Sequence, residues 1–353
     1  MADRPSKIAI YSRLGRIGRY DRNMSILVTG GAGYIGAHVV RLLQEQGQKV
    51  IVVDDLSYGT ADRIGSAPLI KLDLAETSSL APLTEAMMDH DVDSVIHFAA
   101  RKQVGESVER PSWYYQQNVG GMATLLRAMY DAGVDKLVFS SSAAVYGMPD
   151  VPEVPEDLQC KPINPYGETK LVCEWMSRDC ERAWGLKWTA LRYFNVAGAG
   201  WDDLMDPARL NLVPMILERL EKGGTPMIFG DDYDTPDGTC VRDYVHVKDL
   251  ADAHIKALDL IADAQPEVHE FNIGTGHGTS VREIIEGLQE VSGWKFPVEV
   301  KTRRAGDPPV LVGSTDRSRE VMSWKAEYGV NEILTSAWEA WQASKHRITV
   351  PKE

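Results

Sequence analysis

Short apolar runs alternate with longer amphipathic stretches along most of this chain. The apolar runs have the length of strands and are rich in Val, Ile and Leu; they occupy residues 25–30, 49–53, 68–72, 94–98, 136–140, 188–194 and 269–273. The amphipathic stretches have the length of helices and occupy residues 34–46, 77–90, 112–132, 167–184, 208–222, 248–263, 280–291 and 331–344. This alternation predicts an α/β fold with a doubly wound, parallel Rossmann-type sheet covered by helices on both faces.

The same pattern predicts how the chain divides into domains. The alternation fades after residue 198, where Gly and Pro become frequent. We expect the sheet domain to span 25–198, with about 243–274 returning to it. A smaller C-terminal α/β region of 199–242 and 275–345 is expected to bind the substrate. Residues 1–23 carry six Arg or Lys against two Asp and no long apolar stretch, so we expect a disordered or accessory extension.

Composition and charge narrow the class of protein. The 353 residues are 44% hydrophobic and 25% charged, as in soluble globular proteins, and no apolar run is long enough to cross a membrane. A net charge of −13 argues against a nucleic-acid partner. None of the four cysteines belongs to a C-x-x-C pair, so neither a metal site nor a disulfide framework is predicted, and a reducing cytoplasm is the expected location.

A glycine-rich turn follows the first predicted strand and opens the first predicted helix. Gly30 permits a tight turn, Gly33 lets the backbone approach a pyrophosphate, and Gly36 lets the helix pack close to the sheet. The second strand ends at Asp54 and Asp55, where an acidic side chain binds the adenosine ribose and repels a 2′-phosphate. These features predict NAD rather than NADP as the cofactor.

A tyrosine and a lysine stand four residues apart in Tyr166-Gly-Glu-Thr-Lys170, after a serine-rich strand end. In a helix they lie on one face, one turn apart. The lysine ammonium is expected to lower the pKa of the Tyr166 phenol, which is about 10 in a free side chain. With the Ser142 hydroxyl, they predict an acid/base that removes a proton from an alcohol while hydride leaves its carbon.

From about residue 25 to 345 the chain resembles the UDP-glucose 4-epimerases of the extended short-chain dehydrogenase/reductase family. The Tyr166–Lys170 motif is shared across the superfamily. The blocks around His97 and Arg242 are more specific to epimerases of sugar nucleotides. The motifs that carry the resemblance lie at residues 28–36, 97–102, 104–107, 139–147, 164–170, 191–195, 211–214, 238–246 and 303–307.

The resemblance implies which residues contact each ligand. Tyr166 and Lys170 would contact the cofactor as well as perform the acid/base chemistry. Besides the three glycines, the other residues implied to bind NAD are Tyr34, Ile35, Asp54, Asp55, Asp73, Leu74, Phe98, Ala99, Ala100, Lys102, Asn118, Ser140 and Tyr193. The residues implied to bind the UDP-sugar are Lys102, Ser142, Tyr166, Phe194, Asn195, Asn211, Leu212, Phe229, Arg242, Arg304, Asp307 and Leu311.

The residue types fit these implied roles. Arg242 and Arg304 suit a fork-like grip on a diphosphate, although a surface ion pair is the alternative for each. Phe229 can stack on uracil, and Asp307 can bind ribose hydroxyls. Asp73 can reach the adenine edge or be a solvated strand-end carboxylate. The implied activity is interconversion of UDP-glucose and UDP-galactose, in which C4 of the sugar is oxidised to a 4-keto intermediate and reduced again.

Related activities remain alternatives. Dehydratases and decarboxylases of this superfamily place acidic residues just after the catalytic serine, whereas this chain has Ala143 and Ala144. A 4-epimerase of UDP-GlcNAc, UDP-glucuronate or a UDP-pentose is a further alternative. The position of Leu311 holds a tyrosine in narrow family members and a small residue in those that accept N-acetylhexosamines. A non-catalytic NAD-sensing protein is the last alternative, and such proteins typically lack the tyrosine or lysine.

The resemblance also implies an oligomeric state. The stretches 112–132 and 167–184 correspond to helices that pair across a two-fold axis in the family, so a homodimer is implied.

His97 and His246 have no proposed chemistry, and we expect both to be satisfied core or boundary histidines.

Overall fold

The structure is a computed structural model that describes residues 25–262, 266–304, 306–344, 346 and 348; the extension expected at residues 1–23 lies outside them. Its central feature is a seven-stranded sheet of β1 (Ser25–Thr29), β2 (Lys49–Asp54), β3 (Leu69–Lys71), β4 (Val92–His97), β5 (Lys136–Ser140), β6 (Lys187–Tyr193) and β10 (Glu270–Ile273). The order is β10–β6–β5–β4–β1–β2–β3, and every neighbouring pair is parallel. These are the strands that the apolar runs predict, so the doubly wound α/β fold is confirmed.

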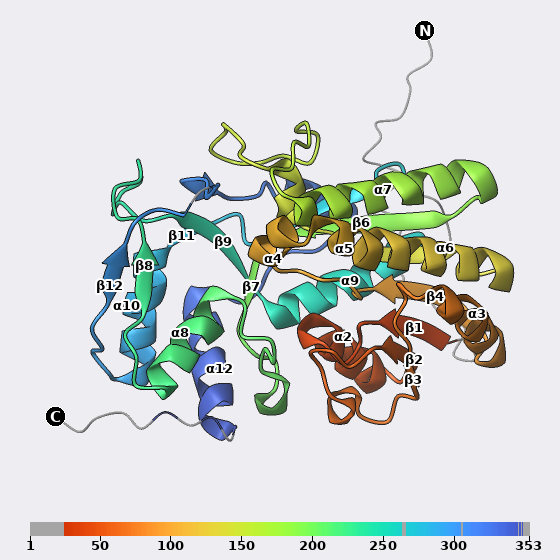
Figure 1. Cartoon of the computed structure of the whole chain (residues 1–353), viewed down its shortest axis with the longest axis horizontal. Helices are drawn as coiled ribbons and strands as arrows, with labels where there is room; N and C mark the ends of the chain where they lie inside the picture. Colours follow the sequence, from red (N-terminus) through yellow and green to blue (C-terminus); the bar gives the residue numbers. More distant parts are fainter. Residues whose placement is uncertain (1–24, 263–265, 305, 345, 347, 349–353) are drawn as a thin grey trace, which may run out of the picture.

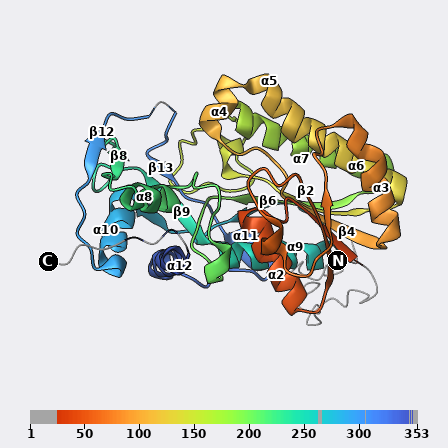
Figure 2. The ribbon, with the colours of Figure 1, turned by 60° about the horizontal axis from the view of Figure 1, so that its bottom comes forward.

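Helices cover both faces of this sheet (Figure 1, Figure 2). One face carries α2 (Tyr34–Glu45), α9 (Val247–Ile261) and α11 (Asp316–Val321). The opposite face carries α3 (Leu80–Asp89), α6 (Gly121–Ala132) and α7 (Pro165–Trp184). Because neither face meets water, the strands are apolar along almost their whole length instead of alternating with polar residues.

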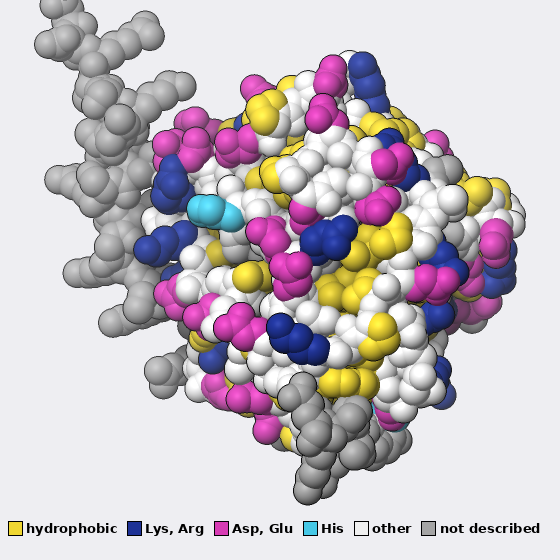
Figure 3. Space-filling model, turned by 90° about the vertical axis from the view of Figure 1, so that its left-hand side faces the viewer, with side chains coloured by type: hydrophobic (Ala, Val, Ile, Leu, Met, Phe, Trp, Pro, Cys, Tyr) yellow, Lys and Arg dark blue, Asp and Glu magenta, His cyan; other side chains and the backbone are white. Residues whose placement is uncertain are grey.

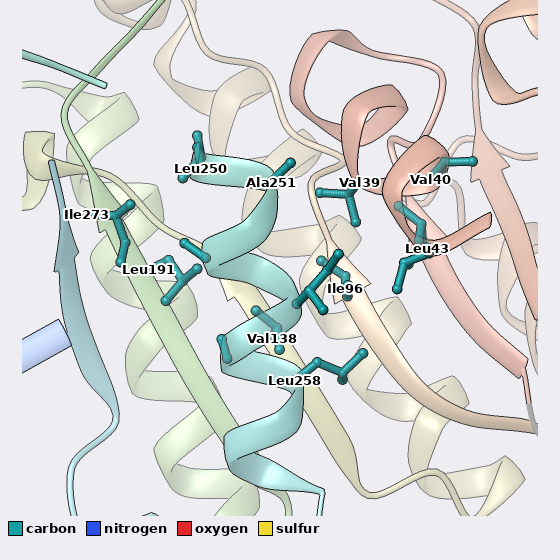
Figure 4. Packing of buried hydrophobic residues seen from close by; sticks show 14 of the residues in the cluster. Val39, Val40, Leu43, Ile96, Val138, Leu191, Leu250, Ala251, Leu258 and Ile273 are labelled. Atoms are coloured by element: carbon teal, nitrogen blue, oxygen red, sulfur yellow. The ribbon is translucent and has the colours of Figure 1, made fainter. Parts of the chain in front are cut away.

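Alternate strand residues belong to two separate hydrophobic cores. In β1, Ile26 and Val28 pack with the α2–α9 layer, whereas Leu27 packs with the α3–α6 layer. Figure 4 shows Leu258 of α9 on the side of that helix toward Leu43 of α2, and Leu250 on the side toward Ile273 of β10. This packing fixes the carboxyl ends of the strands, where the chemistry described below is placed.

The predicted helix over 112–132 is confirmed, and it contains a π-helical segment that the sequence pattern did not predict. The structure has α5 (Pro111–Tyr114), a π-helical segment η3 (Tyr115–Gly120) and then α6, preceded by the short helix α4 (Val104–Glu109). A π-helical segment widens the helix by one residue per turn and is often found at functional sites. Here η3 places Gln117 and Asn118 against Arg101, which follows β4.

The remaining elements form a smaller region beside the sheet, at the left of Figure 1. It contains strands β8 (Met227–Phe229), β9 (Val241–His246), β11 (Gly278–Ser280), β12 (Glu299–Lys301) and β13 (Val310–Leu311), and helices α8 (Leu212–Glu221), α10 (Val281–Ser292) and α12 (Val330–Ala343). These elements surround a third core that includes Leu217, Ile284 and Trp341. The region joins the sheet domain through β7 (Asn195–Ala197), which follows β6 and pairs with β9.

Four single 3₁₀ turns complete the described elements: η1 (Ala61–Ile64), η2 (Thr77–Ser79), η4 (Ala143–Tyr146) and η5 (Asp202–Leu204). Acidic and basic side chains are intermixed on the face of the smaller region that Figure 3 shows. Within the described residues, none of the helices is both long and apolar enough to cross a membrane.

Candidate active site

A cavity of about 420 Å³ opens at the carboxyl ends of β1 and β4. The strand order reverses between these two strands, and ligands of doubly wound folds bind at such switch points. Most of the predicted site residues line this one cavity. They are Gly30, Gly33, Tyr34, Ile35, Gly36, Asp54, Asp55, Asp73, Leu74, Phe98, Ala99, Ala100, Lys102, Ser142, Tyr166, Lys170, Tyr193, Phe194, Asn195, Asn211 and Leu311.

The glycine turn has the geometry of a phosphate cradle. Gly30 has φ +70°, and a Cβ there would lie 2.7 Å from the Ala99 nitrogen. A Cβ on Gly36 would lie 2.2 Å from the Gly30 carbonyl oxygen, so only glycine lets α2 start this close to β1. The first residues of α2 line the cavity, so the unpaired N–H groups of this helix start lie at its wall, where an anionic pyrophosphate can bind.

The two acids that end β2 have different partners. Asp54 is buried, and its carboxylate accepts the Ala32 N–H at 2.9 Å and the Leu56 N–H at 2.8 Å. Each carboxylate oxygen can accept a second hydrogen bond, so Asp54 can still receive a ribose hydroxyl. Burial raises the pKa of Asp54, and the two backbone hydrogen bonds partly offset this effect. Asp55 instead accepts from Arg101 at 2.7 Å.

Tyr166 and Lys170 come from the first two turns of α7. This helix begins at Pro165, after Asn164 accepts the Gly167 N–H at 2.9 Å in an N-cap. Both side chains are buried and line the cavity. Ser142 lines the same wall from the end of β5. The helix and the strand end therefore present a phenol, an ammonium and a hydroxyl to one space.

The expected effect of Lys170 on the Tyr166 pKa does not hold in this structure. Burial raises the pKa of Tyr166 above its ordinary value, and a hydrogen bond with Ser142 offsets only part of the rise. The Lys170 ammonium donates to the Ser140 carbonyl at 2.7 Å and lies 6.0 Å from the Tyr166 ring centre. Burial also lowers the pKa of Lys170 to about 8.

Two predicted cofactor residues lie behind the cavity wall. Ser140 donates to the Tyr193 hydroxyl at 3.0 Å, and its carbonyl accepts from Lys170. Asn118 is buried, accepts the Arg101 N–H and donates to the Arg101 carbonyl. Both residues hold their neighbours in position without lining the cavity themselves.

The predicted uridine-binding residues form two pairs beyond the cavity. The Arg304 guanidinium lies 3.8 Å from the centre of the Phe229 ring, on which uracil was expected to stack. Arg242 donates to the Pro308 carbonyl and lies 3.6 Å from the Asp307 carboxylate. Arg242 is also the β9 neighbour of Leu311, which does line the cavity. Leu212 is the first residue of α8, and its side chain packs against the core of the smaller region.

Several cavity residues were missed by the sequence reasoning, and two of them, Arg101 and Asp206, are charged. Arg101 immediately precedes the predicted Lys102, and its place at the end of β4 was an available signal. Asp206 is buried in an irregular segment that has no periodic pattern. It accepts from Asn211 at 2.7 Å and lies 3.8 Å from the Lys102 ammonium.

The two histidines have structural partners, as expected. His97 is hydrogen-bonded to the Thr29 hydroxyl at 2.6 Å, and burial lowers its pKa to about 3. His246 accepts the Lys248 N–H as the N-cap of α9 and is hydrogen-bonded to Ser336.

Comparisons with known proteins agree with this geometry. The model of the NAD dependent epimerase/dehydratase family matches residues 26–274. The UDP-glucose 4-epimerase of Azospirillum brasilense is 45% identical over 324 residues, which cover 90% of this chain and 92% of that protein. The crystal structure of UDP-glucose 4-epimerase from Brucella ovis in complex with NAD is 40% identical, with a TM-score of 0.85, over 89% of this chain and 97% of that one. The Bifidobacterium longum enzyme in complex with NAD+ and UDP is 36% identical, with a TM-score of 0.84, over 91% and 98%.

Proposed function

Because the chain belongs to the NAD-dependent epimerase/dehydratase family, we propose that it interconverts UDP-glucose and UDP-galactose by NAD-dependent epimerisation at C4 of the sugar. The observation that carries this proposal is one shared cavity. It contains the glycine turn suited to a dinucleotide and the Tyr166, Lys170 and Ser142 side chains suited to an alcohol. Redox chemistry at a sugar hydroxyl needs both parts within contact distance of each other.

The residues present fit NAD as the resident cofactor. The start of α2 would hold the pyrophosphate, and Asp54 would accept a hydrogen bond from the adenosine ribose. NAD, when bound, supplies a hydride acceptor that returns the hydride within the same turnover. The chain would contribute binding, orientation and exclusion of water, which are the usual contributions of a protein to a cofactor enzyme.

Tyr166 is the proposed acid/base. Its phenol, oriented by Ser142, would take the proton of the 4-hydroxyl when the sugar is oxidised and give it back when the 4-keto intermediate is reduced. Because burial raises the Tyr166 pKa, the phenol would hold its proton firmly until positive charge or a hydrogen-bond donor stabilises the phenolate. Lys170 lies close enough to contribute to this stabilisation once the site is filled.

The substrate would be held mainly through its UDP part, while the sugar would be held loosely. An intermediate that presents either face to the same hydride donor has to rotate, so most of the binding energy should come from the nucleotide. Arg242, Arg304 and Phe229 are the proposed anchors, and Arg304 has to leave the Phe229 ring if uracil stacks there. Binding of UDP by the Bifidobacterium longum relative supports this assignment.

The chain lacks acid groups that would divert the intermediate. Ala143 and Ala144 line the cavity beside Ser142, where elimination or decarboxylation would need a carboxylate. An intact Tyr166–Lys170–Ser142 set argues equally against a sensor that only binds NAD. Epimerisation of other UDP-sugars remains the second candidate, and Leu311 at the cavity wall is the residue that bears on it.

The experiment that tests the proposal is direct. Purified protein is incubated with UDP-galactose, and the nucleotide sugars are separated by chromatography. We expect UDP-glucose to form without any consumption of added NAD. If no UDP-glucose appears, even when NAD is supplied, the proposed function is wrong.

We also propose a cytoplasmic homodimer. All four cysteines are free, which suits a reducing compartment. Tyr115 and Trp175 expose apolar surface on neighbouring elements of the α4–α7 layer, where the family resemblance places a two-fold axis. Light scattering at micromolar concentration should give twice the chain mass, and a monomeric mass would reject the dimer.

A further inference from the structure

Arg101 joins the two sides of the cavity at its adenosine end. On one side is the loop after β2, which contains Asp55 and Ser57; on the other is η3, which contains Gln117. The guanidinium donates to Asp55 at 2.7 Å, to Ser57 at 2.5 Å and to Gln117 at 3.0 Å. All four residues line the cavity, so the bridge lies at its boundary.

The bridge is held rigidly from both sides. Asn118 fixes the Arg101 backbone by two hydrogen bonds, at 2.8 and 3.0 Å. The aromatic rings of Tyr58 and Trp113 lie 5.8 and 5.4 Å from the guanidinium carbon. Asp55 is oriented in turn by the Ser57 N–H and hydroxyl, at 2.9 and 2.6 Å. An arginine with these partners loses little further freedom when it makes the ion pair.

The ion pair is sheltered enough to matter. The Arg101 and Asp55 side chains are 14% and 28% exposed, which is well below the exposure of ordinary surface pairs in this chain such as Arg182–Asp179 at 72% and 75%. Burial acts to raise the Asp55 pKa, yet the hydrogen bonds from Ser57 and the Arg101 charge outweigh it and leave the pKa lowered. The Asp55 carboxylate is therefore ionised near neutral pH, and its attraction to Arg101 is screened by salt less than that of an exposed pair.

We propose that Arg101 and Asp55 form a latch across the adenosine end of the cavity, which must open for NAD to enter or to leave. The proposal rests on the proposed function, because it assumes that NAD occupies the cavity. The carboxyl end of β2 binds the adenosine ribose in this fold, and the latch spans from that end to η3. Such a latch would keep a cofactor bound that is regenerated in every turnover.

The test compares the rates of NAD binding and release in two matched variants. Arg101→Met removes the charge and keeps most of the aliphatic stem. Arg110→Met is the control, because Arg110 also stacks on Trp113, at 3.9 Å, but pairs with Glu106 and does not line the cavity. Loaded protein is diluted and filtered at intervals, and the retained NAD is measured by absorbance; binding to stripped protein is followed by quenching of tryptophan fluorescence.

A latch makes a specific kinetic prediction. Breaking it should speed release and entry alike, each by about tenfold, the equivalent of one charge-assisted hydrogen bond, with a much smaller change in Kd. Arg110→Met should resemble the wild type. Unchanged rates in Arg101→Met would overturn the proposal. Faster release of NAD with an unchanged rate of entry would also overturn it, because that result is expected if Arg101 only contacts bound NAD and does not close the cavity.

Three further outcomes keep the latch distinct from the proposed function. If Arg101→Met does not fold, as judged by circular dichroism, the rates of NAD entry and release are measured in the milder variant Asp55→Asn, and they decide whether the latch exists. If the wild type binds no NAD, the proposed function fails before the latch is addressed. If the wild type binds NAD and epimerises while the Arg101→Met rates match it, only the latch is wrong.

Discussion

The buried ion pair between Glu174 and Arg192 should be the most sensitive polar contact behind the active site. Glu174 lies one turn after Lys170 on α7, and Arg192 comes from β6. Their side chains are 1% and 5% exposed. Two Arg192 nitrogens donate to the two carboxylate oxygens at 2.9 and 2.6 Å, and Ser141 donates to the same carboxylate at 2.6 Å. Ser141 directly precedes the proposed catalytic Ser142.

Loss of Glu174 would leave the Arg192 guanidinium buried without its counter-charge. In Glu174→Leu, Arg192 would keep only two neutral acceptors, the Tyr146 hydroxyl and the Glu156 carbonyl, both at 3.1 Å. A buried cation without its counter-charge costs about 3–5 kcal/mol. The double variant Glu174→Leu/Arg192→Met removes both charges of the pair and leaves only neutral former partners of the pair without a hydrogen bond, at about 1–3 kcal/mol. We therefore expect the double variant to be more stable than Glu174→Leu.

The assay is equilibrium unfolding in urea, followed by circular dichroism, for the two single variants and the double variant. Arg178→Met is the matched control, since the Arg178–Glu270 pair joins the same two structural layers but is 38% exposed at the arginine. Its loss should cost no more than about 1 kcal/mol. The loss of unfolding free energy in the double variant should be smaller than the sum of the losses in the two single variants. If it equals that sum, the argument from an uncompensated buried charge is refuted.

Three other predictions concern the site itself. Tyr166→Phe should lower turnover by about 10²–10⁴-fold, as loss of an acid/base does, while NAD stays bound; near-normal turnover would show that the phenol is not the acid/base. Lys170 has a pKa of about 8 in the folded protein against an ordinary 10.5, so between these values the unfolded chain binds more protons and the free energy of unfolding should rise with pH relative to Lys170→Met. Denaturation series from pH 7 to about 10 check this sign, and a fall relative to the variant contradicts it. Leu311 should allow UDP-GlcNAc to react more slowly than UDP-glucose, and Leu311→Gly should raise the UDP-GlcNAc rate; comparable wild-type rates on both sugars would contradict this ranking.

The elements that the sequence predicts well are those whose signal is local. The seven sheet strands are apolar because both faces are buried. Gly36 is required by a close contact with the Gly30 carbonyl inside one β–α turn, and Gly30 by its φ of +70° in the same turn. Tyr166 and Lys170 are one helical turn apart, so their shared face needs only that α7 be a helix. The Asn164 cap and Pro165 that start this helix are local signals too.

The features that the sequence did not predict depend on contacts between distant segments. Lys170 was expected to act on Tyr166, yet the fold offers its ammonium the Ser140 carbonyl, 30 residues away. Asp55 and Arg101 are 46 residues apart and meet only because β2 and β4 flank β1. The strands of the smaller region that were missed are mostly two or three residues long, too short to show a period.

The placement of charge around the cavity explains how a chain of net charge −13 can hold two diphosphates. In the described part of the chain, the cavity is lined by the cations Arg101, Lys102 and Lys170, and each has a partner: Asp55, Asp206 and the Ser140 carbonyl, respectively. A cofactor pyrophosphate therefore depends chiefly on the backbone N–H groups at the start of α2, whose partial charge cannot titrate and carries no counterion to release. The proposed anchors of the UDP diphosphate are instead Arg242 and Arg304, which would have to exchange their present partners, Asp307 and the Phe229 ring. This arrangement gives a cofactor site that is preformed and a substrate site that has to rearrange, as expected for an enzyme that keeps its dinucleotide and releases its sugar nucleotide in every turnover.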